Sequence, residues 1–174
     1  NQELTEVFKL ETDLFPCLVD MRFKGVRVDL EKAALIKKDL MAREAKIINK
    51  IKDLTGLEVE IHAARSIAKA FDKLKLPYDR TAKSNEPSFT KNFLQNHPHE
   101  LATCIADARE INKAHTTFID SITKHAHKGR IHADINQIRS DQGGTVTGRF
   151  SMSNPNLQQI PARHPEIGPM IRSI

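Results

Sequence analysis

The sequence DLEKAALIKKDLMAREAKIINKIKDLTG, residues 29–56, predicts one long helix. Asp29 is a good N-terminal cap because its side chain can accept bonds from the first backbone amides, and Gly56 ends the pattern. At 1.5 Å per residue, this helix is on the order of 40 Å long. Its apolar stripe, at helical spacing, consists of Leu30, Ala33, Ala34, Leu40, Met41, Ile47, Ile48, Ile51 and Leu54.

A further helical pattern precedes this stretch. Residues 2–24 repeat apolar side chains three, four or seven positions apart, and Pro16 either kinks this helix or marks a first turn. Gly25 follows as its expected C-terminal cap. The sequence GVRVD, residues 25–29, alternates briefly between apolar and polar side chains and predicts a short strand that leads into the long helix.

A second long helix is predicted to begin near Pro98 and to end at Lys128-Gly129. His115 lies on its apolar stripe and is expected to be a hydrogen-bonded core residue. Two long helices joined by about 40 residues favour antiparallel packing, with the intervening segment as a small tip at one end.

The predicted tip contains only short elements. Residues 63–75 have the pattern of a short helix, and residues 77–87 (PYDRTAKSNEP) form a polar, irregular segment. Ser88 is expected to cap a small helix. That small helix would hold Phe89, Phe93 and Leu94.

The pattern changes after Gly129. RIHADINQI (130–138) and TVTGRF (145–150) predict two strands, and SDQGG (140–144) predicts the turn of a β-hairpin between them. Residues 151–174 are rich in Asn, Pro and Gln and are expected to form an ordered loop. The predicted fold class is therefore mainly α (α+β): two long antiparallel helices with a small helical tip, then a short β-hairpin and loop.

The composition of the 174 residues is typical of a globular protein, with 39% hydrophobic and 28% charged residues. The net charge of +5 is compatible with a polyanionic partner. Cys17 and Cys104 lack metal-binding spacing, and we expect both to be free, buried thiols in a reducing compartment. Because no apolar run approaches membrane-spanning length and no signal peptide is visible, we expect no membrane partner. The ends of the chain suggest a piece of a longer polypeptide.

Catalytic and metal sites find little support in the residues. Two histidine pairs are spaced i, i+2, so their side chains point in different directions on a helix, and no Cys or carboxylate completes a zinc set. These pairs are His97 with His99 and His125 with His127. Ser151 and Ser153 lack a nucleophile elbow and an acid–histidine pair. We therefore predict no metal ligand and no catalytic residue in this chain.

Arg109 and Lys113 lie one turn apart on the second long helix, and Thr116 and Thr117 extend their row. Such a row is either a solvated helix face or a basic track for backbone phosphates. Periodicity alone favours the solvated face.

The stretch TGRFSMSNPNLQQIPAR, residues 147–163, is rich in hydrogen-bond donors, and residues 142–165 contain no acid. Its donors include Arg149, Ser151, Asn156, Gln158, Gln159 and Arg163. Every base pair offers acceptors in the minor groove of DNA, whatever its sequence. The chemistry of the stretch therefore indicates a possible sequence-independent reader of nucleic acid.

The same stretch closely resembles the T-G-R-[LF]-S-S-x-x-P-N-L-Q-x-I-P-x-R motif of family A DNA polymerases, the bacterial polymerase I type and its phage relatives. Three more segments resemble that family in the same order: MRFKGVRVD (21–29), AREINKAHTTF (108–118) and GRIHADINQ (129–137). The resemblance covers essentially the whole chain. Gln158-Gln159, where bacterial members often have Gln-Asn, points to a phage or prophage version.

The resemblance implies a polymerase thumb followed by the start of the palm. Residues 1–28 would lead into the thumb, 29–128 would form it with a tip at about 57–97, and 129–174 would begin the palm. The parent enzyme would add deoxynucleotides to a primer 3′ end on template–primer DNA, in replication or repair, in the cytoplasm of a bacterial or phage-infected cell. Its Mg²⁺ ions would be held by palm aspartates. Those aspartates follow this segment in the family, so this chain by itself is expected to be inactive.

The resemblance also implies DNA contacts residue by residue. Arg149 matches the arginine that touches the primer-terminal base pair in the minor groove. The remaining motif donors, Ser151, Asn156, Gln158, Gln159 and Arg163, would line the template–primer near the active site. Arg109 and Lys113, with Thr116 beside them, would contact duplex phosphates. The primer backbone would be gripped by Lys83, Ser88 and Thr90.

The chain departs from the family pattern at several positions. Residues 59–62 (VEIH) replace an Asn-x-Asn-Ser run, His115 replaces a lysine, Phe118 a tyrosine and Met152 a serine. Two other functions stay open: a non-catalytic duplex-binding module, and a helical scaffold for protein partners. A palm motif with a metal-binding aspartate beyond Ile174 would exclude the first, and salt-dependent DNA binding would exclude the second.

Overall fold

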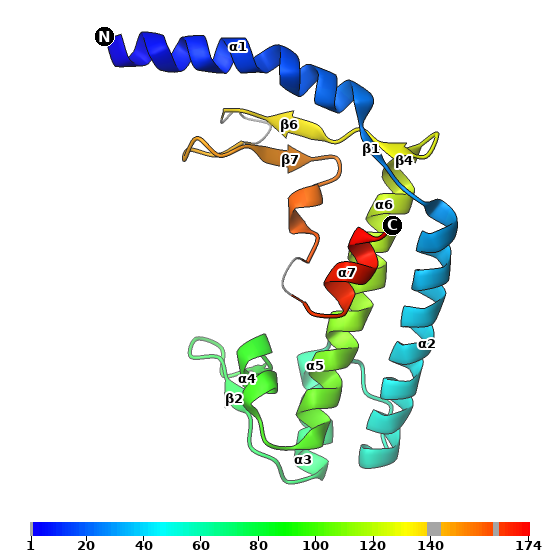
Figure 1. The fold of residues 1–174 in the computed structure, drawn as a ribbon. Helices are drawn as coiled ribbons and strands as arrows, with labels where there is room; N and C mark the ends of the chain where they lie inside the picture. The colour runs from blue at the N-terminus through cyan, green and yellow to red at the C-terminus, as the bar shows by residue number, and fades with distance from the viewer. Residues whose placement is uncertain (1, 139–143, 162–163) are drawn as a thin grey trace. The chain divides into compact units, whose positions relative to one another are not determined.

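The computed structural model describes residues 2–138, 144–161 and 164–174. The chain divides into two compact units. Unit 1 combines Asn1–Leu35 with Phe118–Ile174, and unit 2 is Ile36–Thr117. Helices make up most of the secondary structure, with small antiparallel sheets beside them (Figure 1), as the predicted fold class requires.

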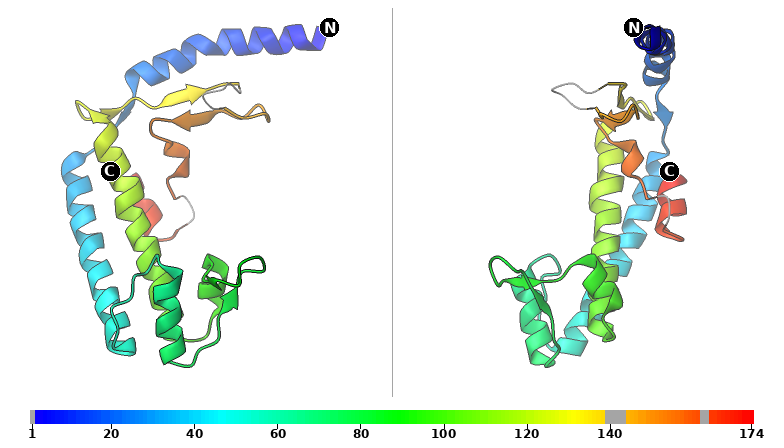
Figure 2. Two further views of the ribbon diagram at one scale, coloured as in Figure 1. Left: turned by 180° about the vertical axis from the view of Figure 1, so that it is seen from behind. Right: turned by 90° about the vertical axis from the view of Figure 1, so that its left-hand side faces the viewer.

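Unit 2 is built on two antiparallel helices, α2 (Leu30–Thr55) and α5 (Glu100–Lys113). They run side by side in both views of Figure 2. Lys50 of α2 pairs with Glu100 at the start of α5, at 2.5 Å, whereas Glu44 bonds to Asn112 near the end of α5. Because the partners run in opposite order, the helices are antiparallel, and this prediction is confirmed.

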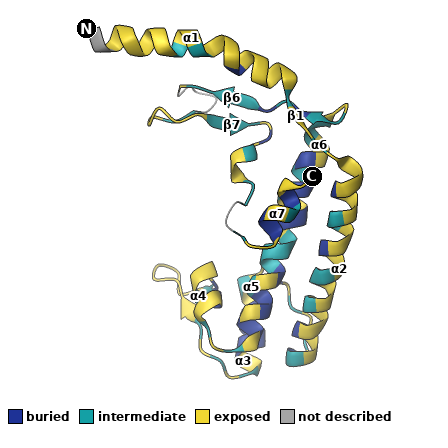
Figure 3. Cartoon of the chain, in the orientation of Figure 1, coloured by how far each residue is buried: buried dark blue, intermediate teal, exposed yellow. Residues whose placement is uncertain are grey.

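The core of unit 2 lies between these helices and the short elements of the tip. Figure 3 shows the buried residues along α5 in dark blue. Phe71 of α3 (Ala64–Lys73) is fully buried, and its ring packs edge-on or tilted against four other rings. Those rings belong to Tyr78, Phe89, Phe93 and His97. This aromatic cluster supplies much of the buried area that holds the tip together.

The tip differs from the prediction in two ways. The segment expected to be irregular contains a small hairpin, in which β2 (Asp79–Arg80) pairs with β3 (Pro87–Ser88). Ser88 belongs to β3, so Ser88 does not cap α4 (Lys91–Asn96). Thr90 caps that helix, because its backbone is extended and its Oγ1 accepts a bond from the amide of Phe93 at 3.2 Å.

Unit 1 contains α1 (Gln2–Lys24), as predicted, with Pro16 inside it. The predicted short strand β1 (Val26–Arg27) pairs with β5 (Arg130–Ile131), which in turn pairs with β4 (Ala126–His127). Gly25 joins α1 to β1 at a φ of +64°, and a Cβ there would lie 2.7 Å from the carbonyl oxygen of Ile131. Only glycine fits this crossing without strain.

The second long helix is interrupted. After α5 the chain continues as a π-helical stretch, η1 (Ala114–Ile119), and then as α6 (Asp120–His125). It ends earlier than predicted because Ala126 and His127 pair with β5. A π-helical stretch inside an α-helix widens one turn, a feature that periodicity of side chains does not reveal.

The predicted hairpin forms with a different second strand. β6 (Asp134–Asn136) pairs with β7 (Ser151–Ser153), whereas residues 145–150 form no strand. Gly148 has a φ of +71°, and Thr145 Oγ1 donates a 2.6 Å bond to the carbonyl of Arg149, so this segment folds into a turn. Most of the expected turn, residues 140–143, lies outside the described residues.

The C-terminal segment has more structure than a loop. Besides β7, it contains the 3₁₀ helix η2 (Leu157–Gln159) and the helix α7 (Ile167–Arg172). Ile167 and Ile171 of α7 are buried. Their burial stabilises this short helix, which the Pro- and Asn-rich sequence does not predict. Among the described residues, no helix has the length and apolar character needed to cross a membrane.

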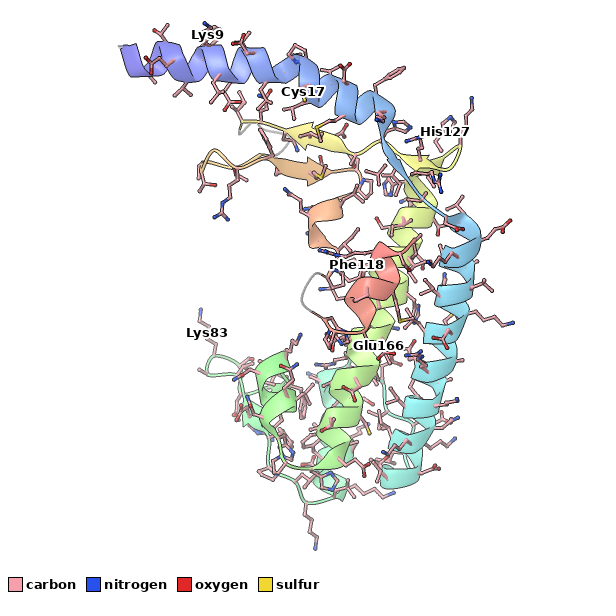
Figure 4. The ribbon with its side chains drawn as sticks, viewed as in Figure 1. Lys9, Cys17, Lys83, Phe118, His127 and Glu166 are labelled. Carbon is pink, nitrogen blue, oxygen red and sulfur yellow. The ribbon has the colours of Figure 1, made fainter. Side chains whose placement is uncertain are left out.

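The two cysteines differ in their surroundings. Cys104 is a buried free thiol, as expected, and burial raises its pKa. Cys17 is also free, but it is exposed on α1 (Figure 4), so the expectation that it is buried is wrong. The periodicity of α1 gave no indication of which side would be covered.

Candidate nucleic-acid interface

The donor-rich segment is held by a turn, a strand and a 3₁₀ helix. Arg149 leaves the turn at Gly148 with an exposed side chain, and its carbonyl is fixed by Thr145. Ser151 follows in β7, half-buried, where its Oγ accepts a 3.4 Å bond from the Asn136 side chain. The turn thus places the guanidinium in solvent, while β7 anchors the residues that follow.

The amide side chains beyond β7 form hydrogen bonds with the backbone of their own segment. Asn156 caps η2, with its Oδ1 accepting a bond from the amide of Gln158 at 3.1 Å. Gln158 Nε2 donates a 3.0 Å bond to the carbonyl of Phe150, next to Arg149. Asn156, Gln158 and Gln159 are all exposed. The structure therefore ties Gln158 to the residue that follows Arg149 and ties Asn156 to Gln158, within a segment that contains no acid.

Arg163 belongs to the same predicted group, but it lies outside the described residues. Within unit 1, the described acids that flank the acid-free residues 142–165 are Glu166, just before α7, and Asp134 of β6. The Asp134 carboxylate is held by Arg22 at 2.5 Å and by Asn154 Nδ2 at 2.9 Å. The Asp134 carboxylate is therefore bonded to α1 and to the residue that follows β7.

The predicted contacts in the tip lie on and beside the β2–β3 hairpin. Lys83 is exposed in the loop of this hairpin and points away from the tip (Figure 4). The loop is closed by Thr81, whose amide donates to the Glu86 carbonyl at 2.9 Å. Ser88 is half-buried in β3, and Thr90 is exposed at the start of α4. Lys83, Ser88 and Thr90 therefore lie on one supersecondary element.

The row of Arg109, Lys113 and Thr116, which begins on α5 and continues into η1, is not uniformly exposed. Lys113 and Thr116 are exposed, and Thr116 Oγ1 donates to the Asn112 carbonyl at 2.8 Å. Arg109 is half-buried, and its guanidinium donates to the carbonyls of Ile61 and Phe89 at 2.6 and 2.8 Å. Burial lowers the pKa of Arg109. Neither periodicity nor the family motif revealed these two carbonyl partners.

A partly buried polar chain links α2 to the end of α5 and the start of η1. His115 Nε2 bonds to Glu44 Oε2 at 2.5 Å, and Asn112 Nδ2 donates to Glu44 Oε1 at 2.9 Å. His62, before α3, bonds through Nε2 to Asn112 Oδ1 at 3.1 Å. The prediction that His115 is a hydrogen-bonded core residue is confirmed. Sequence analysis did not identify Glu44, because a single carboxylate on an amphipathic helix is normally exposed.

A metal site finds no support in the described part of the chain, where no three or more His, Cys, Asp or Glu side chains are grouped to hold an ion. The described residues therefore do not fit the Mg²⁺ ions that the sequence resemblance implies for the parent enzyme. The predicted contact residues fall into two groups. Those of the tip and α5 belong to unit 2, and those from Arg149 to Gln159 belong to unit 1.

Comparisons with known proteins agree with the sequence motifs. The sequence profile of DNA polymerase family A matches residues 30–174. The chain is 31% identical to a DNA-directed DNA polymerase of Pseudomonas phage M6 over 184 residues, covering 100% of this chain and 27% of the phage protein. It is 34% identical to the DNA polymerase DpoZ of Acinetobacter phage SH-Ab 15497, covering 100% of this chain and 31% of that protein.

A solved structure shows the same fold. It is the POL domain of Pol1 from M. smegmatis in complex with DNA primer-template and dNTP, and the TM-score is 0.77 at 24% identity. The match covers 98% of this chain and 31% of the mycobacterial chain, so this protein spans less than a third of that length. The profile match over most of the chain shows the relationship directly: this chain belongs to DNA polymerase family A.

Proposed function

We propose that this chain is the template–primer-binding thumb, with the start of the palm, of a DNA-directed DNA polymerase that extends primer 3′ ends in replication or repair. Residues 1–28 lead into the thumb, 29–128 form it with a tip at about 57–97, and 129–174 begin the palm. Family membership and the names of the phage relatives support this proposal. With it comes the expectation of a cytoplasmic location in a bacterial or phage-infected cell.

The observation that carries the proposal is the donor-rich segment that contains Arg149 and no acid. Arg149, Asn156, Gln158 and Gln159 are exposed there, and internal bonds fix the backbone that carries them. Minor-groove acceptors occupy similar positions in every base pair, so fixed donors can test pairing geometry without reading sequence. Arg149 would contact the primer-terminal base pair, and Ser151, the three amides and Arg163 would line the duplex beside it.

The second group would hold the DNA backbone. Lys83, Ser88 and Thr90 would grip the primer strand from the tip hairpin and the start of α4. Lys113 at the end of α5 and Thr116 in η1 would contact duplex phosphates. Contacts of this kind add affinity and salt dependence without sequence preference. The partners are thus template–primer DNA and, for the whole polymerase, deoxynucleoside triphosphates.

The nucleotidyl-transfer step lies outside the residues of this chain. In the parent enzyme, palm aspartates outside this chain would hold the Mg²⁺ ions, which would supply charge stabilisation for that step. This chain's residues would orient the duplex so that the primer terminus is held ready for that step. We therefore expect the purified 174-residue chain to bind duplex but to incorporate no nucleotide.

Substitution of Arg149 in the full-length polymerase tests the minor-groove assignment. We expect Arg149→Ala to lower the single-turnover incorporation rate by about tenfold or more, because a charged donor is lost beside the reacting terminus. The Kd for duplex should change less. Lys113→Ala is the matched control, since it should weaken binding and reduce the salt slope of log K by about 0.9 while changing the rate little. An unchanged rate in Arg149→Ala would contradict the assignment.

A titration of the 174-residue chain with primer–template duplex, at several salt concentrations, tests DNA binding itself. Affinity that falls linearly with log salt is expected. A response independent of salt, or no binding, would favour a helical scaffold for protein partners. Nucleotide incorporation by this chain alone would contradict the expectation that its catalytic residues lie elsewhere.

A further inference from the structure

Arg109 joins α5 to two separate segments of the tip. Its Nε donates to the carbonyl of Ile61 at 2.6 Å, and its Nη1 donates to the carbonyl of Phe89 at 2.8 Å. Both acceptors are neutral backbone groups, 48 and 20 residues away along the chain. The planar guanidinium is thus used as a fork that fixes two loops against one helix.

The first of these loops is tied to α5 a second time. His62, directly after Ile61, bonds to Asn112, which lies one turn beyond Arg109 on α5. Two consecutive residues of this loop are therefore bound by side chains from one face of α5. The other loop is linked to α5 a second time by a longer contact, in which Lys91 Nζ lies 3.7 Å from Glu110 Oε1. Arg109 supplies the hydrogen bond to the Phe89 carbonyl itself.

The position of Phe89 makes this bond important for the tip contacts. Phe89 lies between Ser88 and Thr90, which are both predicted to bind the primer backbone. Its ring is buried beside Phe71, with ring centroids 4.9 Å apart. The buried ring fixes the side chain of Phe89, and Arg109 fixes its carbonyl. The backbone that carries Ser88 and Thr90 is therefore held in place on either side of Phe89.

The surroundings of the guanidinium agree with an internal role. The side chain is half-buried, and this burial lowers its pKa. Lys113, one turn further along α5, is exposed instead. The two cations of the row, which the sequence treats alike, are therefore in different environments.

We propose that Arg109 is a positioning residue for primer binding, which orients Ser88 and Thr90 by holding the carbonyls of Phe89 and Ile61, and not a ligand of duplex phosphate. This inference rests on the proposed function of the tip.

The conservative variant Arg109→Lys separates the two roles, because lysine keeps the charge but cannot form the fork. A phosphate ligand would be largely rescued by lysine. A positioning residue would not, so Arg109→Lys and Arg109→Ala should weaken duplex binding by a similar factor, about three- to tenfold. Their salt slopes should match the wild type, whereas the Lys113→Ala control should lose about 0.9 in slope. Rescue by lysine together with a reduced slope in Arg109→Ala would overturn the proposal.

A double-mutant cycle tests whether Arg109 acts through the tip hairpin. Ser88→Ala should weaken binding in the wild type but have little further effect in Arg109→Lys, because Ser88 is already misplaced. Independent effects of the two substitutions would overturn the proposal. Circular dichroism of both variants verifies that the helices are intact.

Hydrogen exchange provides a readout that does not require DNA. The amides of Phe93 and Leu94, bonded to Thr90, should exchange faster in Arg109→Lys, while amides in the middle of α2 should not change. Unchanged exchange at Phe93 and Leu94 would overturn the proposal even if the wild type binds duplex. Absence of salt-dependent binding by the wild type would instead overturn the proposed function and leave this structural result to stand.

Discussion

Unit 2 buries, fully or partly, most of its large apolar side chains, whereas unit 1 leaves many of them exposed. Unit 2 gathers them into one core in which Phe71, Ile67 and Ile105 are fully buried. Unit 1 leaves much of α1 uncovered, with Phe8 and Phe23 exposed by 72% and 86%. Among the described residues, the large apolar side chains that are exposed lie in unit 1, except for Met41 and Ile48.

The difference has a physical meaning. A helix–tip unit that encloses its own aromatic cluster derives its stability from contacts within itself. A helix with a broad uncovered apolar face is typical of a segment that packs against further protein. The chain spans 27% and 31% of the two phage relatives. We expect unit 2 to depend less than unit 1 on further protein for its folding.

The sharpest test of this comparison is a pair of Phe→Ala substitutions. Phe71→Ala should reduce the free energy of unfolding by about 3–5 kcal/mol, because it opens a cavity in the aromatic cluster. Phe8→Ala, on the exposed face of α1, should change it by less than about 0.5 kcal/mol. Urea denaturation followed by circular dichroism measures both. Equal costs would mean that unit 2 does not dominate the stability of the chain.

The partly buried polar chain of unit 2, from Glu44 to Asn112 and His115, should give the next largest effect. Glu44→Ala leaves Asn112 and the buried His115 without their acceptor, which should cost on the order of 2 kcal/mol. Asp39→Ala is a suitable control, since Asp39 forms an exposed i, i+4 pair with Arg43 on the same helix. That pair should contribute less than about 0.5 kcal/mol. Similar losses in both variants would show that the partly buried chain has no special role.

In unit 1, the bonds of Asp134 to Arg22 and Asn154 should contribute less to stability than the Glu44 chain of unit 2. Asp134→Ala removes the ion pair with Arg22 and the bond from Asn154, both partly exposed, and should cost about 1 kcal/mol. High salt should reduce the difference between variant and wild type, because the pair with Arg22 is screened. Thermal denaturation with and without added salt measures this effect. A cost as large as that of Glu44→Ala would remove the contrast between the units.

The smallest expected effect concerns the surface pair at the start of α5. A hydrogen bond from Lys50, and then its positive charge, lowers the pKa of Glu100 from its usual 4.5. Its contribution to stability is therefore present above pH 4.5 and is lost as the pH falls through the lowered pKa. Glu100→Gln should lower the thermal midpoint slightly at neutral pH and not at all in strong acid. A difference that persists in acid would assign the effect to lost packing.

Much of the helical framework could be predicted, because helices are set by local periodicity and by caps within a few residues. Asp29 shows this: its Oδ1 accepts a 2.9 Å bond from the amide of Lys32 at the predicted start of α2. The donor-rich segment was also identified from residue types and motif alone. Its DNA contacts, like those of the tip, remain predictions that the experiments above address.

The sequence by itself determined the positions of the long helices, the end of α1 at Gly25 and the family, since each depends on neighbouring residues or on a linear motif. Only the tertiary structure decided the rest. The pairing of β6 with β7 depends on a turn at Gly148, and the role of Arg109 depends on carbonyls of Ile61 and Phe89. Strand register, burial and side-chain partners are set by contacts between residues far apart in the chain, and local sequence does not encode them.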